Sequence, residues 1–278
     1  MAMARRRHLQ IALMLAPGVV LCGLLFLYPI FGILKLSLFN PGFTLASFEK
    51  LVSSPVAELV IRRTFFLALT VTALCFVLGY PIAYHLAHMQ PRWRAFFIYL
   101  ILLPFWISVL IRTYTWMVLL GREGLVNGTL LRLGLIDQPV QLLFTNFAVH
   151  LAMVQILLPI MVLTSFAAMI EIDPQLVKAA RTLGASPGKA FRKVFFPLSL
   201  GGAAAGAIIC FILALGFYVT PALLGGRRNI MLANLIDFEV HQTLNWSFAS
   251  VLALVLLAAT LVLLGLFRLV APERRLHG

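Results

Sequence analysis

A single arginine inside an otherwise apolar stretch marks the residues best suited to binding chemistry. Arg112 is followed closely by Tyr114, Thr115 and Trp116, and Trp106 precedes it. A charged side chain is costly in a hydrocarbon environment, so Arg112 is expected to face protein, water or a membrane surface. Trp106, Tyr114 and Trp116 could hold a cation over their ring faces. The alternative is that Arg112 and these aromatic residues anchor the chain at a membrane interface.

Two further groups of polar residues are candidates for a substrate pathway. Tyr218 and Thr220 stand just before Pro221, which predicts a break in an apolar helix where backbone carbonyls are free to line a cavity. Asp237 and Glu239 are the carboxylates that we would choose for attracting a polycation. The alternative for this pair is two solvated charges on an interfacial helix.

The sequence holds no recognisable active site. It has no nucleophile–base pair, no paired carboxylates on one helix face, no HExxH motif and no Walker A loop for ATP. His85, His150 and Gln155 lie in apolar stretches, where hydrogen bonds between helices are their expected role. We therefore expect no catalytic residues, and no nucleotide bound by this chain itself.

The composition indicates an integral membrane protein. Hydrophobic residues make up 62% of the chain and the mean hydropathy is +1.01, whereas soluble domains are about half apolar. Runs of about 20 apolar residues are long enough to cross a bilayer as helices. The sequence predicts one all-α transmembrane domain over residues 1–278, with six spans at about 9–36, 62–87, 95–120, 146–170, 198–220 and 247–270. We expect the first span to be retained, because no small-residue cleavage site closes it.

The three cysteines, Cys22, Cys75 and Cys210, each fall inside a predicted span. They have neither CxxC spacing nor a matching histidine cluster, so they indicate no metal site and no disulfide. Their expected role is to fill space between helices as small packing residues.

The net charge of +13 is distributed in a way that argues for membrane topology rather than nucleic-acid binding. No basic run has the interleaved aromatic residues of a nucleic-acid surface. With a cytoplasmic N-terminus, the inner segments carry three of the nine acidic residues and thirteen of the 22 basic ones. Those thirteen are Arg5, Arg6, Arg7, Arg92, Arg94, Lys178, Arg181, Lys189, Arg192, Lys193, Arg268, Arg274 and Arg275. The positive-inside rule therefore predicts that both termini are cytoplasmic.

The loop between the fourth and fifth spans, residues 171–197, reads as two short helices with defined ends. Asp173, followed by a proline, is a helix N-cap with proline at the first helical position. Gly184 ends this helix, because glycine accepts the left-handed conformation common at helix C-termini. Ser186, again followed by a proline, predicts the start of a second helix. Such a loop is a rigid object rather than a flexible connection.

The same loop resembles the EAA motif of ATP-binding-cassette (ABC) importer permeases. The resemblance is carried by Ala179, Ala180, Gly184 and Pro197, while Lys178 replaces the glutamate of the motif. In that family the segment is the coupling helix, which sits in a groove on a separate ATPase subunit. The alternative is an ordinary positive-inside loop that happens to contain alanine and glycine.

The resemblance implies which residues contact the ATPase. The expected ATPase-coupling residues are Lys178, Ala179, Ala180, Arg181, Gly184, Ser186 and Pro197. The basic residues Lys178, Arg181, Lys189, Arg192 and Lys193 could meet an acidic rim on the partner. Because Lys178 stands where relatives have glutamate, any ion pair made by that glutamate is absent or reversed here.

Three further stretches, 78–87, 102–127 and 217–226, look like the first permease subunit of spermidine/putrescine-type importers. This likeness implies the transmembrane domain of a type I ABC importer in a bacterial inner membrane. It implies as partners two ATPase subunits, which bind ATP and Mg²⁺, a second and related permease, and an extracytoplasmic solute-binding protein. This chain itself would bind no cofactor and no metal.

The expected function is thus that of a permease subunit, not an enzyme, in an importer for polyamines or a similar small organic solute. One alternative keeps the importer and changes the solute to iron, thiosulfate, molybdate or an opine-like compound. A second alternative is an ion-driven secondary transporter or channel. That class would need a carboxylate or proton relay inside the membrane, and the centres of the spans contain none.

Overall fold

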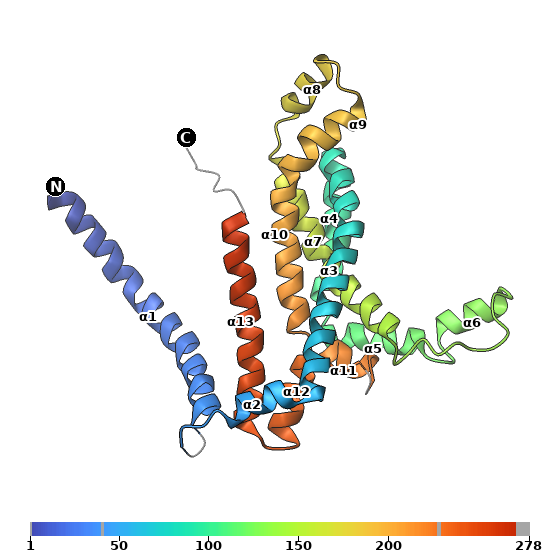
Figure 1. Cartoon of the computed structure of the whole chain (residues 1–278). Coiled ribbons are helices and arrows are strands. Elements are labelled where there is room, and N and C mark those ends of the chain that lie inside the picture. The colour runs from blue at the N-terminus through green and yellow to red at the C-terminus, as the bar shows by residue number, and fades with distance from the viewer. Residues whose placement is uncertain (1, 40–41, 227–228, 271–278) are drawn as a thin grey trace. The chain divides into compact units, whose positions relative to one another are not determined.

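Regular structure is entirely helical in the residues that the computed structural model describes, 2–39, 42–226 and 229–270 (Figure 1). The predicted all-α class is therefore confirmed for this part of the chain. The α-helices are α1 (Ala2–Leu38), α2 (Ala46–Ser53), α3 (Pro55–His88), α4 (Pro91–Leu102), α5 (Val109–Leu120), α6 (Leu125–Arg132), α7 (Asn146–Ile170), α8 (Pro174–Thr182), α9 (Pro187–Ala190), α10 (Phe196–Leu215), α11 (Val219–Leu224), α12 (Leu232–His241) and α13 (Trp246–Val270). A 3₁₀-helix, η1 (Leu103–Trp106), follows α4, and a π-helix, η2 (Phe191–Phe195), joins α9 to α10.

Five helical stretches of the described chain are long and apolar enough to cross a membrane. They are Met14–Leu38, Pro55–His88, Asn146–Ile170, Pro187–Leu215 and Trp246–Arg268. A sixth span results if Pro91–Trp106 and Val109–Arg132, which meet at 93°, are counted together. Arg274 and Arg275, which the orientation prediction used, lie outside the described residues.

The predicted third span, 95–120, is bent rather than straight. The chain leaves η1 through Ile107, whose backbone is extended, and Ser108 then starts α5 as its N-cap. The Leu110 N–H donates a 3.3 Å hydrogen bond to Ser108 Oγ. Serine satisfies a free N–H of the new helix in this way, so a cap inside an apolar run favours a break that hydropathy alone does not reveal.

The helix that begins at Pro187 continues through η2 into α10, which corrects the prediction of a separate second helix in the loop. Pro197 lies within this continuous helix. Proline lacks the N–H of a regular turn and its ring crowds the carbonyl four residues earlier. The π-turn just before it, in which the Phe196 N–H bonds to the Phe191 carbonyl, widens the helix at this point.

Contacts divide the chain into two compact units, Met1–Pro55 with Ile236–Leu257 and Val56–Leu235 with Ala258–Gly278. In the first unit, α1 exposes its large apolar side chains from Met14 onward. Such a helix is stable where its surroundings are apolar. In the same unit, Lys50 on α2 lies 4.2 Å over the ring of Phe248 on α13.

In the second unit, α7 packs closely against α10 through two glycines (Figure 1). A side chain at Gly202 would overlap Ala168, and one at Gly206 would overlap Thr164. Glycines four residues apart on one face let two helix backbones approach, which is a strong source of association in lipid. The Gly- and Ala-rich stretch after Leu198 therefore provides the close contact between these two helices.

Candidate functional site

The segment after α7 begins with a well-formed N-cap. Asp173 Oδ1 accepts a 2.8 Å hydrogen bond from the Gln175 N–H, and Pro174 occupies the first position of α8. Ser186 has the extended backbone of an N-cap before α9, but its side chain accepts no hydrogen bond from that helix. The first predicted cap is therefore confirmed in full, and the second only in its backbone.

The end of α8 depends on Gly184, which has a φ of +86°. The Ala185 N–H bonds to the Ala180 carbonyl at 3.1 Å, and the Gly184 N–H bonds to the Arg181 carbonyl at 3.0 Å. This pair of hydrogen bonds is the Schellman arrangement that closes a helix when the next residue is left-handed. The predicted stop at Gly184 is confirmed. We call α8 and α9 together the helical arm.

The two faces of α8 differ in chemistry. Pro174, Val177, Lys178 and Arg181 recur at helical spacing and share one face, which borders a pocket. Outside this face lie Leu176, Ala179 and Leu183, all exposed, with Leu183 88% exposed at the end of the helix. Lys178 and Arg181 border the pocket and are exposed as well, so α8 presents both basic and apolar side chains to its surroundings.

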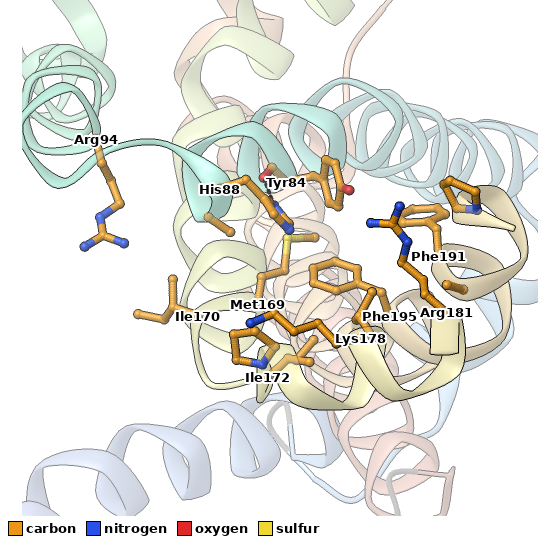
Figure 2. A pocket seen from close by; sticks show the side chains of 15 residues that line it. Tyr84, His88, Arg94, Met169, Ile170, Ile172, Lys178, Arg181, Phe191 and Phe195 are labelled. Atoms are coloured by element: carbon orange, nitrogen blue, oxygen red, sulfur yellow. Dashed lines mark hydrogen bonds between the residues drawn. The ribbon is translucent and has the colours of Figure 1, made fainter. Parts of the chain in front are cut away.

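The pocket behind α8, which we call the arm pocket, has a volume of about 440 Å³ (Figure 2). The ends of α3 and α7, the beginning of α4 and the inner face of the arm surround it. Its lining residues are Tyr84, Ala87, His88, Arg94, Met169, Ile170, Ile172, Pro174, Val177, Lys178, Arg181, Pro187, Ala190, Phe191 and Phe195. Figure 2 shows Arg181 extending toward Phe191 and Tyr84, while Arg94 comes from α4.

An aromatic cluster joins the arm side of the pocket to α3. The Tyr84 ring meets those of Phe191 and Phe195 edge-on, with ring centroids 5.3 and 5.2 Å away. The His88 ring lies 4.3 Å from Tyr84 and 5.5 Å from Phe195. Each aromatic pair contributes about 0.5–1.5 kcal/mol beyond simple burial. The sequence carried a signal for this cluster that we did not use, because Tyr84 and His88, like Phe191 and Phe195, stand four residues apart on a helix.

A buried apolar core lies directly next to this cluster. It includes Leu86 from α3, Met169 from α7 and Phe195 from η2, and Val177 of α8 packs against it. Tyr80 Oη is 2.6 Å from Ser199 Oγ, which adds a polar link between α3 and α10. Through Val177 and this core, the arm is packed continuously onto α3, α7 and α10.

Arg112 and the aromatic residues around it lie in different surroundings. Trp106 in η1 is 90% exposed and Tyr114 in α5 is about half exposed. Trp116 faces a second pocket of about 390 Å³, which we call the α7 pocket. Arg112 is partly buried, and its Nε and Nη1 atoms have no hydrogen-bond partner among the described residues. The predicted aromatic lining around Arg112 stays a prediction.

The α7 pocket also contains a polar group without a partner. Gln155 borders the pocket together with Trp116, and its buried Oε1 accepts no hydrogen bond in the described chain. The expected hydrogen bond between helices is therefore wrong for the Gln155 carbonyl. It is confirmed for His150, whose Nε2 is 2.8 Å from Thr70 Oγ1 of α3, while its Nδ1 is 2.7 Å from the Asn146 carbonyl within α7.

The break in the fifth predicted span occurs where α10 ends at Leu215 and α11 begins at Val219. Thr220 is fully buried, and its Oγ1 is 3.1 Å from Thr113 Oγ1 of α5. The Tyr218 carbonyl accepts a 2.9 Å hydrogen bond from Asn234 Nδ2. The exposed polar groups expected at the break are thus engaged by Thr113 and Asn234, which sequence reasoning did not single out.

The carboxylates Asp237 and Glu239 belong to the first compact unit and both are paired there. Glu239 is 8% exposed, with Oε1 4.0 Å from Lys50 Nζ and Oε2 accepting a 2.6 Å hydrogen bond from Thr243. Asp237 Oδ1 lies 2.9 Å from His241 Nδ1. Glu239 is therefore a buried, bonded group rather than a solvated charge, and it is open to a cation only if Lys50 moves.

Comparison with known proteins identifies the type of molecule. The family profile described as "Binding-protein-dependent transport system inner membrane component" matches residues 11–276. The chain belongs to this family. As a member it is a permease subunit of an ABC importer, a transport component of the inner membrane rather than an enzyme.

Two relatives and one solved structure illustrate this family membership. The chain is 35% identical over 214 residues to the spermidine/putrescine transport system permease protein PotB of Salmonella typhimurium strain SL1344, covering 77% of this chain and 74% of that protein. It is 34% identical over 228 residues to PotB of Escherichia coli strain K12, covering 82% and 81%. The fold resembles a chain of a bacterial alginate ABC transporter crystallised with an alginate-bound periplasmic protein, with a TM-score of 0.76, 19% identity and coverage of 94% and 93%.

Proposed function

We propose that this permease carries polyamines, or a closely similar small organic cation, into the cell. The identity to permeases named for spermidine and putrescine, which extends over about four fifths of the chain, is the observation that supports this solute. Two ATPase subunits that bind ATP and Mg²⁺, a second and different permease chain, and an extracytoplasmic binding protein complete the transporter. The chain crosses the membrane six times, with the bent pair α4–η1 and α5–α6 counted as one span, and both termini are cytoplasmic.

The helical arm is the part that receives the force of ATP binding. Leu176, Ala179 and Leu183 are exposed on it and offer apolar contacts that suit a groove on an ATPase. Lys189, Arg192 and Lys193 are exposed beyond the arm pocket and suit an acidic rim around that groove. Gly184 and Ser186 fix the turn between α8 and α9.

Transport then follows from two states of the assembled importer. ATP binding brings the two ATPase subunits together. This movement carries along the helical arm of this chain and the corresponding segment of the second permease. The core next to the arm passes this motion to α3, α7 and α10, which opens the pathway to the outside, where the binding protein releases its solute. ATP hydrolysis restores the inward-open state. The arm must bind the ATPase differently in the two states, because only a difference in binding free energy shifts their populations.

Arg112, Trp106, Tyr114 and Trp116 form the proposed outer part of the pathway, together with the break at Tyr218 and Thr220. We add Gln155, because this residue and Trp116 border the same pocket and the buried carbonyl oxygen of Gln155 has no partner in the described chain. An amide oxygen can accept a hydrogen bond from an ammonium group, and an indole face attracts it. Asp237 and Glu239 serve as attracting charges only when released from their present partners.

Uptake by the reconstituted importer tests the solute. The permease is assembled in proteoliposomes with its ATPase and its second permease, and the binding protein is supplied loaded with labelled spermidine. We expect accumulation that requires both ATP and the binding protein. Accumulation of molybdate or thiosulfate without any of spermidine or putrescine would contradict the solute. Transport by the permease without an ATPase would contradict the importer itself.

A further inference from the structure

The arm pocket has an excess of positive charge. Arg94, Lys178 and Arg181 line it, and none of the fifteen lining residues is acidic. None of the three cations makes an ion pair within the described chain, where both ion pairs lie elsewhere. Three like charges around one cavity repel one another, so an anion between them is electrostatically favoured.

The pocket lies where membrane-length helices end. His88 is the last residue of α3, Ile170 is the last residue of α7, and Arg94 stands in the first turn of α4. Away from the pocket, each of these helices runs into its apolar stretch. With these helices spanning the bilayer, the pocket therefore lies at the level of the lipid headgroups. Beyond Arg94, α4 exposes large apolar side chains, with Phe96 56%, Tyr99 74% and Leu100 53% exposed. A ligand with a negatively charged head and an apolar tail matches the basic pocket with its head and the exposed apolar side chains of α4 with its tail.

We propose that the arm pocket binds the headgroup of an anionic phospholipid, such as phosphatidylglycerol. Arg94, Lys178 and Arg181 surround the headgroup with positive charge, and each can donate hydrogen bonds to it. The aromatic cluster around Tyr84 forms the apolar wall of the pocket, and the acyl chains run along α4. Basic pockets at the ends of membrane helices recognise anionic lipids by this combination of charge and depth.

The bound lipid would join α4 to α8. No direct ion pair connects these two elements in the described chain, and cations on both attract the anionic headgroup. Ala179 and Leu183 lie outside the residues that line the pocket and are exposed. A lipid in this place restrains the arm and leaves its outer surface available.

Native mass spectrometry of the purified, delipidated full-length chain in detergent tests this proposal. Dioleoylphosphatidylglycerol and dioleoylphosphatidylcholine are titrated separately, and we expect tighter binding of the anionic lipid. Arg94→Gln and Arg181→Gln should each weaken phosphatidylglycerol binding about fivefold, the effect of one basic residue at a membrane surface. Matched controls are Arg92→Gln and Lys193→Gln, which remove exposed cations outside the pocket and should change binding less than twofold. Thermal unfolding verifies that each variant is folded.

A second measurement separates lipid from free anion. Millimolar inorganic phosphate should not displace phosphatidylglycerol, and the lipid should slow hydrogen exchange in α8 in the wild-type chain but not in the Arg94→Gln, Arg181→Gln double variant. The proposal is overturned if phosphatidylcholine binds as tightly, if phosphate competes at these concentrations, or if the double variant binds phosphatidylglycerol like the wild type. Equal losses in the control variants would also overturn it, since they would indicate a general surface attraction.

Discussion

At the scale of single residues, Gly184 holds a conformation that other residues adopt only with strain. Its φ of +86° lets the last carbonyls of α8 find partners, and no neighbouring atom lies within 4 Å of the place where a Cβ would stand. Space is therefore not what requires glycine here. The requirement is the left-handed backbone, which costs other residues about 1–2 kcal/mol.

Replacing Gly184 by alanine should loosen the end of α8 by about 1 kcal/mol and reduce ATP-driven uptake. Hydrogen exchange at Ala185 and proteoliposome uptake measure the two effects. Gly188→Ala is the matched control, because that glycine also faces open space but lacks a positive φ. Gly184→Asn should restore part of the loss, since asparagine tolerates the left-handed region. Equal exchange in the two alanine variants would show that the backbone at Gly184 is unimportant.

Gln155 allows a pathway role to be separated from a structural one. Gln155→Leu removes a buried carbonyl that has no partner, so the thermal unfolding midpoint of the purified chain should stay the same or rise. Uptake should fall about three- to tenfold, which corresponds to one lost hydrogen bond to the solute. Ser165→Ala is the control: its Oγ is equally unpartnered on α7, but it borders neither the arm pocket nor the α7 pocket. A parallel loss of uptake and stability in Gln155→Leu would contradict the pathway role.

Local chemistry explains which residue-level predictions succeeded. The caps at Asp173 and Gly184 involve atoms within five residues, so the sequence contains the whole interaction. The partners of Glu239 and Thr220 come from distant parts of the chain, at Lys50 and Thr113. The free carbonyl of Gln155 was unpredictable for the same reason, because only the packed helices show that nothing reaches it.

At the scale of elements, the α7–α10 contact depends on the absence of side chains at Gly202 and Gly206. Gly206→Leu would force the two helices apart against Thr164, so it should destabilise the chain by about 1–3 kcal/mol, the usual cost of overpacking. The thermal unfolding midpoint in detergent measures this loss. Gly201→Leu is the control, because it faces open space. A similar midpoint for both leucine variants would contradict close packing through this face.

Hydropathy predicted where long helices lie but not how they are joined. The length of an apolar run can be read directly from the sequence. The predicted spans agree with α3, α7, α10 and α13 to within a few residues at most of the helix ends. The bend at Ile107 and Ser108 arises from a competing cap inside an apolar run. The continuity of α9 with α10 arises from a π-turn that accommodates Pro197. Both depend on hydrogen bonds that neither hydropathy nor the presence of proline specifies.

At the scale of the whole molecule, the mechanism that we propose requires that movement of the arm reach the membrane helices. The aromatic cluster around Tyr84 and the adjoining core supply that connection. Tyr84→Ala should therefore weaken coupling: ATP hydrolysis by the assembled importer continues, while the solute transported per ATP falls severalfold. The ratio of uptake to phosphate release in proteoliposomes measures this. Loss of hydrolysis and uptake in equal proportion would indicate failed assembly instead.

The most direct test of the account is photo-crosslinking from the two faces of α8 in the assembled importer. A photoreactive phenylalanine analogue is placed at Leu183, on the exposed end of the arm, or at Val177, which packs against the core. We predict that position 183 crosslinks to the ATPase subunit and position 177 does not. Crosslinks from position 183 to lipid alone, with no ATPase attached, would contradict the central claim that the helical arm docks on the ATPase subunit of the importer.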